Sequence, residues 1–489
     1  MAFVDFSTFT GVRSHFQPFD FFQLKQIKSK DLVRLGLEKG SLAGLALDIL
    51  RKHYKHGDPS EGMALLQQLL ANPGEFAEHP IFGPIAQKLL PPPEPVAGQK
   101  FALLDASKGY RTYGIEGIDA ATVEQMDLAM RLPVTQAGAL MPDAHLGYGL
   151  PIGGVLATRG VVIPYAVGMD IGCRMCLTVT DMPASELSRD RDRLRKIVRE
   201  NSAFGKEIFT DPSDDAILER PEFGELPLLR ELQGLAARQI GSSGSGNHFV
   251  ELGIVELDAY SPDLGLAAGS YLGILTHSGS RALGATVAQH YTDLARQLCQ
   301  LPKTASHLAW LDLDKSEGQE YWMAMNLAGD FASACHHDIH RRILKALGAG
   351  SLTVVENHHN FAWKEILPTG EEAIVHRKGA TPAALGELGV IPGSMLHPGF
   401  VVRGKGNPAS LSSASHGAGR RLSRTKATNS FTRHAIEKQL AKAEVTLIGG
   451  SPEEAPDAYK DIFEVMAAQA DLVDVIAKFW PKVVRMDKG

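Results

Sequence analysis

The stretch Tyr165-Ala-Val-Gly-Met-Asp-Ile-Gly-Cys-Arg-Met-Cys176 places a carboxylate and two thiols around a glycine turn, directly before a run of strand-forming residues. Asp170 and Cys173 stand three positions apart. A thiolate can bridge two metal ions of borderline softness while a nearby carboxylate binds one of them, so this pair predicts the nucleus of a dinuclear metal site. A structural zinc site on Cys173 and Cys176 is the alternative. The chain has no second CxxC, and Cys176 has the alternation of an inward strand residue, which disfavours zinc.

Three histidines in distinctive settings could complete a metal site. His248 follows the run Gly241-Ser-Ser-Gly-Ser-Gly246, which can turn tightly and present backbone N–H groups to an anion. His277 closes an apolar run before an expected helix start near Ser278 to Arg281, a position suited to phosphate. The third is His359, the second of two consecutive histidines. Any one of them alone would more often be an ordinary core or surface residue.

A second histidine pair has a different interpretation. His336 and His340 stand at positions i and i+4 of an expected helix, which imitates a metal-binding pair. The glutamate that follows the first histidine in zinc hydrolases is missing. We therefore predict that these two are surface residues.

A further histidine lies in the glycine-rich block Ser415-His-Gly-Ala-Gly-Arg-Arg-Leu-Ser-Arg424. Small neighbours leave the imidazole of His416 accessible to a phosphorus atom, while Arg420 and Arg424 can neutralise phosphate oxygens. A plain basic loop is the alternative. The chain has no Walker motif and no G-x-G-x-x-G fingerprint, so neither a P-loop nor a Rossmann nucleotide site is supported.

The organisation of the chain indicates two regions. The segment Leu90-Pro-Pro-Pro-Glu-Pro95 predicts a stiff, proline-rich linker. We place a domain boundary near residue 98, with a mainly helical accessory region at 1–97 and a catalytic domain at 98–489. Phe22 to Lys55 has helical periodicity. Beyond the boundary we expect strands and helices in an α+β class, with strands at Val155–Thr158, Met175–Thr180, Phe249–Leu252 and Thr353–Glu356 and helices at Ala184–Asn201, Arg281–Leu301 and Gly318–Leu347.

The charge of the whole chain does not indicate a nucleic-acid partner. The 489 residues carry a formal net charge of −6, so any site for a polyanion must be local. One local candidate is the stretch from Arg403 to Thr428, which has no acidic residue; a solvated loop explains it equally well. Its basic residues are Arg403, Lys405, Arg420, Arg421, Arg424 and Lys426.

The cellular setting follows from what the chain lacks. Its four cysteines are too few for a disulfide framework in so long a chain and suit a reducing compartment. The first residues do not form a secretory signal, and no apolar window of about 18 residues occurs. We expect a cytoplasmic protein with no membrane partner.

Several of these stretches together resemble the successive motifs of the RtcB family of RNA-splicing ligases. They occur in the family's order between residues 141 and 420, and the terminal Asp487-Lys-Gly489 is similar to the family's ending, so the resemblance covers roughly residues 100 to 489. It implies a compact α+β fold with a central dinuclear metal and nucleotide pocket. The stretches are Met141-Pro-Asp-Ala-His-Leu-Gly, Val167-Gly-Met-Asp-Ile-Gly-Cys, Gly244-Ser-Gly-Asn-His-Phe-Val-Glu, His277-Ser-Gly-Ser-Arg, His359-Asn360, Arg377-Lys-Gly-Ala, Pro392-Gly-Ser-Met and Ser415-His-Gly-Ala-Gly-Arg.

The resemblance implies a role for particular residues. One Mn²⁺ would be held by Asp170, Cys173 and His248, and a second by Cys173, His277 and His359. His416 would be the guanylylated residue, and Arg281 and Arg424 would bind RNA phosphates. Positions matching the guanine-nucleotide site are Asn247, Glu251, Asn360, Pro392, Gly393, Ser394, Met395, Gly417, Ala418, Gly419, Tyr459 and Lys488, with Glu251 and Lys488 as guanine readers.

The activity implied is that of a GTP- and Mn²⁺-dependent RNA ligase. It would join RNA 3′-phosphate or 2′,3′-cyclic phosphate ends to 5′-hydroxyl ends through a GMP-histidine intermediate, in tRNA splicing or RNA repair, with an activating protein as a further partner. Two other functions stay open: a guanylyltransferase that only caps 3′-phosphate ends, and a non-catalytic nucleic-acid-binding accessory protein.

The chain also departs from the family pattern. Leu396-His-Pro-Gly399 stands where small polar residues are usual, and Gly399 occupies the place of a common phosphate-binding serine. A missing hydroxyl donor is worth about 1 kcal/mol in a buried site. Arg174 follows Cys173 where glycine is usual. These changes leave the metal ligands and His416 intact and affect the predicted substrate.

Overall fold

The computed structural model describes residues 28–37, 41–54, 59–90 and 98–488. The chain divides into two compact units, Met1–Val96 and Ala97–Gly489, which are considered separately. No helix among the described residues is long and apolar enough to cross a membrane.

The first unit is helical over its described residues. Its four α-helices are α1 (Ser29–Arg34), α2 (Ser41–His53), α3 (Pro59–Ala71) and α4 (Gly83–Leu89). They enclose their own small apolar core, with Leu50, Leu66 and Phe82 among its fully buried side chains. The predicted helical segment Phe22 to Lys55 contains α1 and α2, whereas its residues 22–27, 38–40 and 55 lie outside the described part.

The second unit is built around an eight-stranded sheet. Neighbouring strands along its main path are antiparallel, and β19 forms a long central strand between β7 and β16. The strand order is β11 (Ser351–His358), β6 (Arg174–Pro183), β8 (Gly269–Ser278), β7 (Phe249–Leu257), β19 (Val473–Met486), β16 (Gly399–Gly404) and β15 (Leu388–Ile391), with β18 (Thr446–Ile448) parallel to β19.

A second sheet of five strands carries other motif residues. Its order is β12 (Asn360–Ile366), β13 (Glu372–Lys378), β4 (Ile152–Thr158), β3 (Thr135–His145) and β2 (Arg111–Thr112). A separate two-stranded pair joins β14 (Ala380–Pro382) to β17 (Ser413–Ser415), with Ala380 opposite Ser415. This pairing brings the segment before His416 beside the end of β13. The two remaining pairs are β1 (Gln99–Lys100) with β9 (Cys299–Gln300) and β5 (Val161–Val162) with β10 (Leu311–Asp312).

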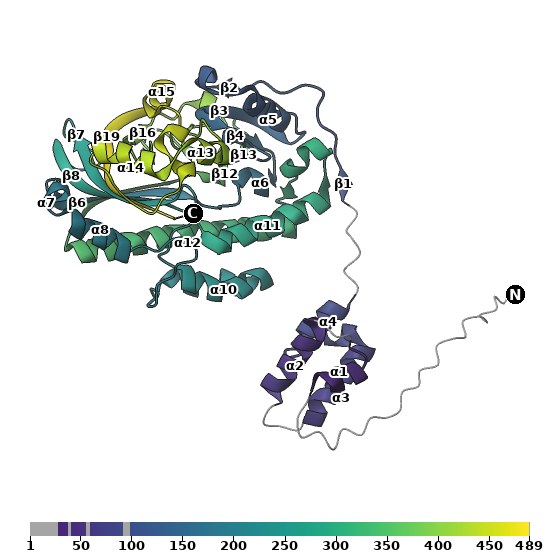
Figure 1. Ribbon diagram of the computed structural model, residues 1–489. Coiled ribbons are helices and arrows are strands. Elements are labelled where there is room, and N and C mark those ends of the chain that lie inside the picture. The colour runs from purple at the N-terminus through teal and green to yellow at the C-terminus, as the bar shows by residue number, and fades with distance from the viewer. Residues whose placement is uncertain (1–27, 38–40, 55–58, 91–97, 489) are drawn as a thin grey trace. The chain divides into compact units, whose positions relative to one another are not determined.

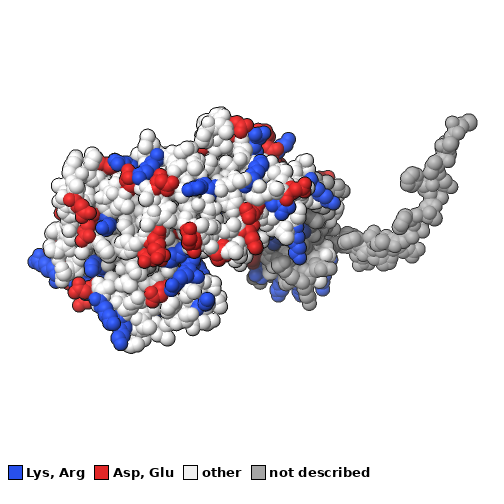
Figure 2. Space-filling model, turned by 90° about the horizontal axis from the view of Figure 1, so that it is seen from above, with Lys and Arg blue, Asp and Glu red and all other residues white. Residues whose placement is uncertain are grey.

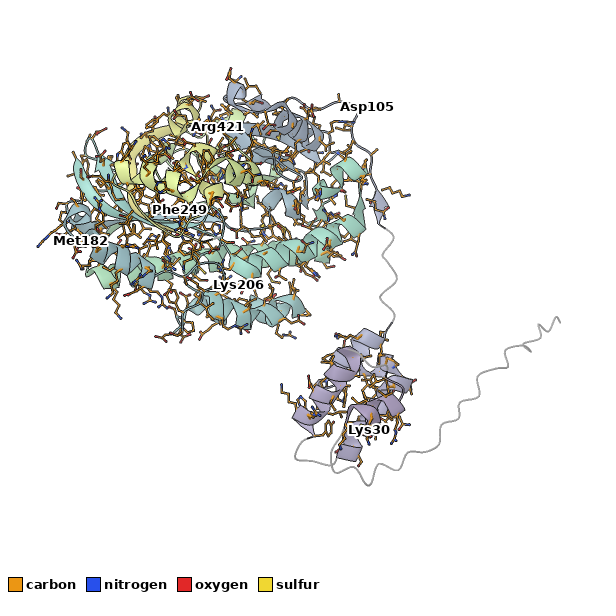
Figure 3. All side chains as sticks on the ribbon, in the orientation of Figure 1. Lys30, Asp105, Met182, Lys206, Phe249 and Arg421 are labelled. Carbon is orange, nitrogen blue, oxygen red and sulfur yellow. The ribbon has the colours of Figure 1, made fainter. Side chains whose placement is uncertain are left out.

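Helices cover one face of the larger sheet. The longest is α12 (Ser316–Leu347), which runs beside α11 (Arg281–Leu298) below the sheet in Figure 1. Ile339 and Ile343 of α12 pack against Leu272 and Ile274 of β8. The interior between sheets and helices is filled by side chains (Figure 3). The other helices of this unit are α5 (Ala120–Met130), α6 (Pro164–Val167), α7 (Glu186–Arg189), α8 (Arg191–Glu200), α9 (Glu222–Glu225), α10 (Pro227–Gln239), α13 (Arg424–Ser430), α14 (Arg433–Lys442) and α15 (Ile462–Ala467).

The predicted class and most predicted elements are confirmed. The unit mixes helices and largely antiparallel sheets, which is an α+β architecture, and all four predicted strands lie within β4, β6, β7 and β11. The predicted helix Ala184–Asn201 is instead two helices, because Asp190 leaves the helical conformation and its carboxylate caps α8 at Arg193 N–H. The predicted helix Arg281–Leu301 ends at Leu298 and is followed by β9.

The prediction that His336 and His340 lie on the surface is wrong. Both rings lie on the sheet-facing side of α12, with 0% and 4% of their surface exposed. Their imidazoles are hydrogen-bonded to threonine hydroxyls of the sheet, which satisfies buried polar atoms that would otherwise be costly. Helical spacing alone could not distinguish this inner face from the outer one.

Candidate active site

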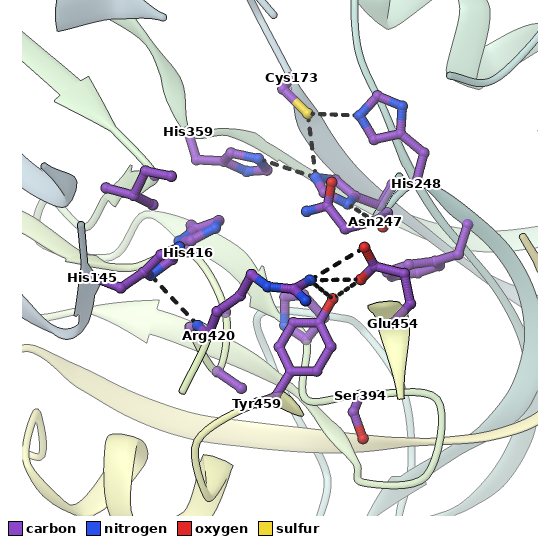
Figure 4. A pocket seen from close by; sticks show the side chains of 18 of the residues that line it. His145, Cys173, Asn247, His248, His359, Ser394, His416, Arg420, Glu454 and Tyr459 are labelled. Carbon is purple, nitrogen blue, oxygen red and sulfur yellow. Dashed lines mark hydrogen bonds and ion pairs between the residues drawn. The ribbon is translucent and has the colours of Figure 1, made fainter. Parts of the chain in front are cut away.

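A cavity of about 760 Å³ lies among the loops that end the strands of both sheets. It brings together most of the residues predicted from the sequence, and Figure 4 shows several of them converging. The predicted residues on its walls are Asp170, Cys173, Asn247, His248, Glu251, His277, His359, Asn360, Pro392, Gly393, Ser394, Met395, His416, Gly417, Ala418, Gly419, Arg424 and Tyr459.

The Cys173 thiol lies at the centre of a cluster of possible metal ligands. Its Sγ atom is 3.3 Å from Nε2 of His248 and 3.2 Å from Nε2 of His277. Nε2 of His277 is also 3.2 Å from Nε2 of His359, and Nε2 of His248 is 3.0 Å from Oδ2 of Asp170. These atoms form two groups that share the thiol: Asp170, Cys173 and His248, and Cys173, His277 and His359.

Backbone pairing fixes the positions of these ligands. Cys173 stands just before β6, and its carbonyl accepts a 3.0 Å hydrogen bond from the N–H of His359, which lies between β11 and β12. His277 lies on β8, flanked in the sheet by Met175 of β6 and Phe249 of β7. Three segments that are far apart in sequence thus converge where the neighbouring strands β6, β8 and β11 begin or end.

The Asp170 carboxylate occupies the position that the sequence suggested for phosphate. Its Oδ1 atom accepts a 3.1 Å hydrogen bond from the N–H of Ser280, the residue before α11. Gly279 makes this approach possible, because a Cβ atom there would lie about 2 Å from the carboxylate oxygens. The helix start therefore orients a ligand residue.

The protonation states of the histidines favour metal binding. The Nδ1–H of His277 donates to the carbonyl of Asn247 over 3.1 Å, so its Nε2 lone pair points toward Cys173. Burial, followed by the neighbouring His248, lowers the pKa of His277 to about 3. Burial likewise lowers the pKa of His359 well below its ordinary value. Both rings are therefore neutral near pH 7, as metal ligation requires.

The Cys173 thiol needs a cation to ionise. Burial, followed by Asp170, raises its pKa well above the ordinary value. A bound metal ion reverses this preference, since a coordinating thiol is deprotonated. A thiolate, three imidazoles and a carboxylate fit ions of borderline softness, and among the described residues no candidate metal-ligand group contains both Cys173 and Cys176. The alternative of a CxxC zinc site therefore has no support in the structure.

The His416 ring lies beside the metal-ligand cluster. Its ring centroid is 4.9 Å from that of His359. Its Nδ1 atom lies 2.6 Å from Oδ2 of Asp143, which also accepts the N–H groups of His416 and Gly417 over 3.1 and 3.3 Å. Since the carboxylate can only accept, Nδ1 carries the proton, and in the neutral ring the lone pair is therefore on Nε2.

The loop after His416 passes very close to the backbone of Asp143. Gly419 has φ +73, and a Cβ atom there would lie 2.0 Å from the carbonyl oxygen of Asp143. Only glycine satisfies both conditions. The glycines that the sequence suggested for accessibility thus also allow the loop to pass over the Asp143 segment.

The Arg420 guanidinium is neutralised within the protein. It is 3.1 Å from the Glu454 carboxylate and 5.2 Å from the Tyr459 ring centroid, and the Tyr459 hydroxyl donates to Glu454. Burial, followed by the charge of Glu454, raises the pKa of Tyr459. Arg420 therefore orients Tyr459 and Glu454 on the cavity wall and supplies little free charge.

Glu251 and Lys378 have perturbed pKa values on the cavity wall. Burial raises the pKa of the Glu251 carboxyl well above its usual range. It also lowers the pKa of Lys378 to about 7, although the ammonium donates to the carbonyls of Tyr148 and Tyr165. Such perturbed groups in a cleft are typical of functional sites.

Two predicted residues are not on the cavity wall. Lys488 is exposed near the end of the described chain. Arg281 donates to the hydroxyl of Ser242 and the carbonyl of Gly205, at 3.1 and 2.6 Å. It lies near His248, since a Cβ atom at Gly244 would meet both side chains.

Several residues in or next to the cavity had no role predicted from the sequence. Asp143 and His145 lie in the Met141 stretch and Lys378 in the Arg377 stretch, so the motifs marked their places without indicating their functions. Glu454 had no such signal. These residues were missed because their roles depend on contacts with partners that are distant in sequence, as between Asp143 and His416.

The basic stretch from Arg403 to Thr428 does not form one patch. Arg403 and Lys405 pair with Asp474 at 3.4 and 2.9 Å. On the face seen in Figure 2, basic and acidic side chains are interspersed. Only the part that includes Arg420, Arg421 and Arg424 reaches the cavity.

Comparison with known proteins gives consistent matches over the second unit. A family model described as tRNA-splicing ligase RtcB matches residues 125–220 and 227–487. The chain is 34% identical over 391 residues to RNA-splicing ligase RtcB1 of Escherichia coli strain ATCC 25922, covering 73% of this chain and 92% of that protein. It is 34% identical over 423 residues to RNA-splicing ligase RtcB of Mycobacterium tuberculosis, covering 71% and 96%. It is 29% identical over 435 residues to tRNA-splicing ligase RtcB of Thermococcus kodakarensis, covering 74% and 90%.

Proposed function

This chain belongs to the RtcB family of RNA-splicing ligases, and from that premise we propose that it joins RNA ends through a GMP-histidine intermediate on His416. Family membership supports RNA ligation. The finer proposal is that a 3′-phosphate or 2′,3′-cyclic phosphate end is joined to a 5′-hydroxyl end with GTP as co-substrate. The observation that carries it is the Asp143 carboxylate 2.6 Å from Nδ1 of His416.

The first step uses the free lone pair of His416. Asp143 holds the proton on Nδ1, so Nε2 can attack the α-phosphorus of GTP, forming a phosphorus–nitrogen bond while pyrophosphate leaves. The carboxylate also stabilises the positive charge that develops on the ring. Two backbone N–H bonds to the same carboxylate oxygen keep the loop in place.

Two Mn²⁺ ions fit the shared ligand cluster. When bound by Asp170, Cys173, His248, His277 and His359, they would neutralise charge on phosphoryl oxygens as Lewis acids. The side chains contribute the arrangement: imidazoles with Nε2 directed inward and one thiol common to both groups.

The nucleotide would occupy the side of the cavity formed by the Pro392 and Gly417 loops. Asn247, Glu251 and Tyr459 offer polar groups for a purine edge, while the small residues from Gly417 to Gly419 let the triphosphate approach His416. Asn360 braces the metal-ligand side, because its amide donates to the Asp170 carbonyl and accepts the N–H of Gly379. Lys488 remains a proposed guanine reader.

The later steps transfer the guanylyl group. An RNA 3′-phosphate oxygen attacks the phosphorus of the adduct, which breaks the phosphorus–nitrogen bond and returns the lone pair to His416. The 5′-hydroxyl of the second end then attacks the activated 3′-phosphate, and GMP leaves. A 2′,3′-cyclic phosphate must first be opened by water. Arg424, on the cavity wall, is proposed to hold RNA phosphate, and Arg281, near His248, to support this contact.

A capping enzyme is the second candidate. Gly399 lies on the cavity wall and has no hydroxyl with which to hold the terminal phosphate. Weak holding at this point would slow sealing and leave guanylylation unaffected. The metal ligands and His416 line one cavity, and the buried Asp143 contacts His416, which favours catalysis over a purely binding role.

The proposal is tested by labelling with GTP. Protein incubated with α-labelled GTP and Mn²⁺ should become covalently labelled, and the label should be acid-labile and alkali-stable, as expected for a phosphoramidate. His416→Ala should abolish labelling, whereas His434→Ala, at an exposed position of α14, should retain it. Full labelling of His416→Ala, or label on a lysine, would exclude this mechanism.

A further inference from the structure

Helix α12 carries two buried imidazoles that the proposed reaction does not use. His336 and His340 lie one turn apart on the face of α12 that packs against β6 and β8. The Thr276 hydroxyl of β8 lies between them, 2.5 Å from Nδ1 of His336 and 2.8 Å from Nε2 of His340. The Thr178 hydroxyl of β6 is 2.7 Å from Nδ1 of His340.

The hydrogen bonds of this network have one consistent direction. Nε2 of His336 is 3.1 Å from the carbonyl of Ser278, which can only accept, so Nε2 carries the proton and Nδ1 accepts from Thr276. The Thr276 oxygen then accepts from Nε2–H of His340, whose Nδ1 accepts from Thr178. Each ring nitrogen has a partner, and burial lowers the pKa of both rings well below 6.5, which agrees with neutral imidazoles.

The His336 ring contacts β8 at the two residues on either side of the proposed metal ligand His277. Its two nitrogens bind the residues immediately before and after His277, which are Thr276 and Ser278. Successive side chains of a strand point to opposite faces, so Thr276 faces α12 while His277 faces the cavity. The register agrees, because Cys176 lies opposite Thr276 and Met175 lies opposite His277.

We propose that His336 is a positioning residue that holds β8 at Thr276 and Ser278 and so fixes the Nε2 atom of His277 for metal binding. Asn247 orients the His277 ring from the cavity side, through its carbonyl, and His336 fixes the backbone from the opposite side. The inference rests on the proposed metal site, since it concerns the affinity of that site for its ion.

A cation in this second cluster is the competing explanation. Cys176, His336 and His340 offer ligand atoms within 4.8 Å of one another. A cation would have to displace the threonine hydroxyls from both rings, and it would have to take the Nε2 proton of His336 away from the Ser278 carbonyl or leave that nitrogen unused. The hydrogen-bonded arrangement therefore accounts for the cluster without an ion.

Two variants of His336 test its contacts with Thr276 and Ser278. His336→Leu removes both at similar volume, whereas His336→Gln keeps an amide near the position of Nε2 that can donate to the Ser278 carbonyl. Loss of groups that orient a metal-bound histidine typically weakens metal binding about 10- to 100-fold. We expect that loss for His336→Leu and most of the wild-type affinity for His336→Gln.

The control is a variant of the same helix that does not touch the residues around His277. Ile343→Ala, one turn beyond His340, removes apolar packing in the core between α12 and the sheet. Mn²⁺ affinity of the full-length protein is measured from the free-ion signal in electron paramagnetic resonance, and Tm is measured in EDTA.

The outcomes distinguish the inference from the proposed function. Weaker Mn²⁺ binding by His336→Leu than by Ile343→Ala at matched Tm, with recovery in His336→Gln, supports the positioning role. Equal Mn²⁺ affinity in the Leu and Ala variants overturns it while leaving the proposed function standing. Stoichiometric zinc in the purified protein that disappears in His336→Leu also overturns it, in favour of a second metal site. A wild-type protein that binds no Mn²⁺ contradicts both proposals.

Discussion

The Oδ2 atom of Asp143 lies 2.6 Å from Nδ1 of His416 and accepts two backbone N–H groups of the same loop. Asp143 is fully buried and stands 273 positions before His416 in the chain. Lys460 fixes its segment by donating to the carbonyls of Pro142 and Ala144, at 3.1 and 2.7 Å. The carboxylate thus determines both the tautomer and the orientation of the proposed nucleophile.

The first prediction concerns this carboxylate. Asp143→Asn removes the negative charge, and an amide nitrogen facing the ring would place the proton of His416 on Nε2. By analogy with other carboxylate–histidine pairs, labelling by GTP should slow by about 10² to 10⁴-fold. Rapid-quench labelling with α-labelled GTP measures the rate. Asp457→Asn, at an exposed position of the same unit, is the control, and an unchanged rate in Asp143→Asn would refute the role of the carboxylate.

The second prediction concerns the metal ions. Crystals grown with Mn²⁺ should give two anomalous peaks less than about 4 Å apart, as in other two-metal phosphoryl-transfer sites. Cys173→Ser should lose at least one peak, because the thiol belongs to both ligand groups. Cys176→Ser should keep both, because its thiol faces α12, 4.0 Å from Nδ1 of His340. A single tetrahedral zinc on the two cysteines would contradict the dinuclear site.

The third prediction concerns Gly399. It lies on the cavity wall at the start of β16, and an added Cβ atom would lie 3.3 Å from Cα of Pro392, which is a tight contact. Gly399→Ser should supply a hydroxyl worth about 1 kcal/mol, or roughly fivefold in sealing at limiting RNA, without changing guanylylation. Gly399→Ala is the matched control, since it adds the Cβ atom without the hydroxyl. Equal sealing rates of the Ser and Ala variants would show that a hydroxyl at position 399 does not improve sealing.

The fourth prediction concerns a buried histidine outside the cavity. Nε2 of His376 accepts the N–H of Ile163 over 2.9 Å, and its Nδ1–H donates to the carbonyl of Leu156 over 3.1 Å. Burial lowers its pKa from 6.5 to about 4. Between those values the unfolded chain binds more protons than the folded one, so the stabilisation is fully present above pH 6.5 and is lost as pH falls toward 4.

The lowered pKa of His376 also sets how much folding stability should be lost at low pH. The free energy of unfolding of the wild-type protein should fall relative to that of His376→Gln by up to about 3 kcal/mol between pH 7 and pH 4. Urea unfolding of both proteins at several pH values in this range gives the difference. His434→Gln, at an exposed position, should show no such change, and a pH-independent gap for His376→Gln would be inconsistent with a neutral buried ring.

The sequence by itself determined the local features of this protein. The period of the apolar residues located the strands within β4, β6, β7 and β11, and the spacing of Asp170 and Cys173 within one turn indicated a shared ligand nucleus. These inferences succeed because covalent geometry fixes the alternation of side chains along a strand and keeps residues that are three positions apart in a turn close together. The ordered motifs also predicted one site for His248, His277, His359 and His416, and all four line the same cavity.

The tertiary structure alone decided which side chains meet. The pairing of Asp143 with His416 depends on two strands of different sheets, and the burial of His336 and His340 depends on which face of α12 meets β8. A helical i, i+4 spacing is the same on the inner and the outer face, so the sequence could not show that these rings are buried. Such contacts arise when elements that are far apart along the chain pack together. Buried polar groups must then find hydrogen-bond partners, and this requirement selects the partners, whereas the local sequence pattern does not.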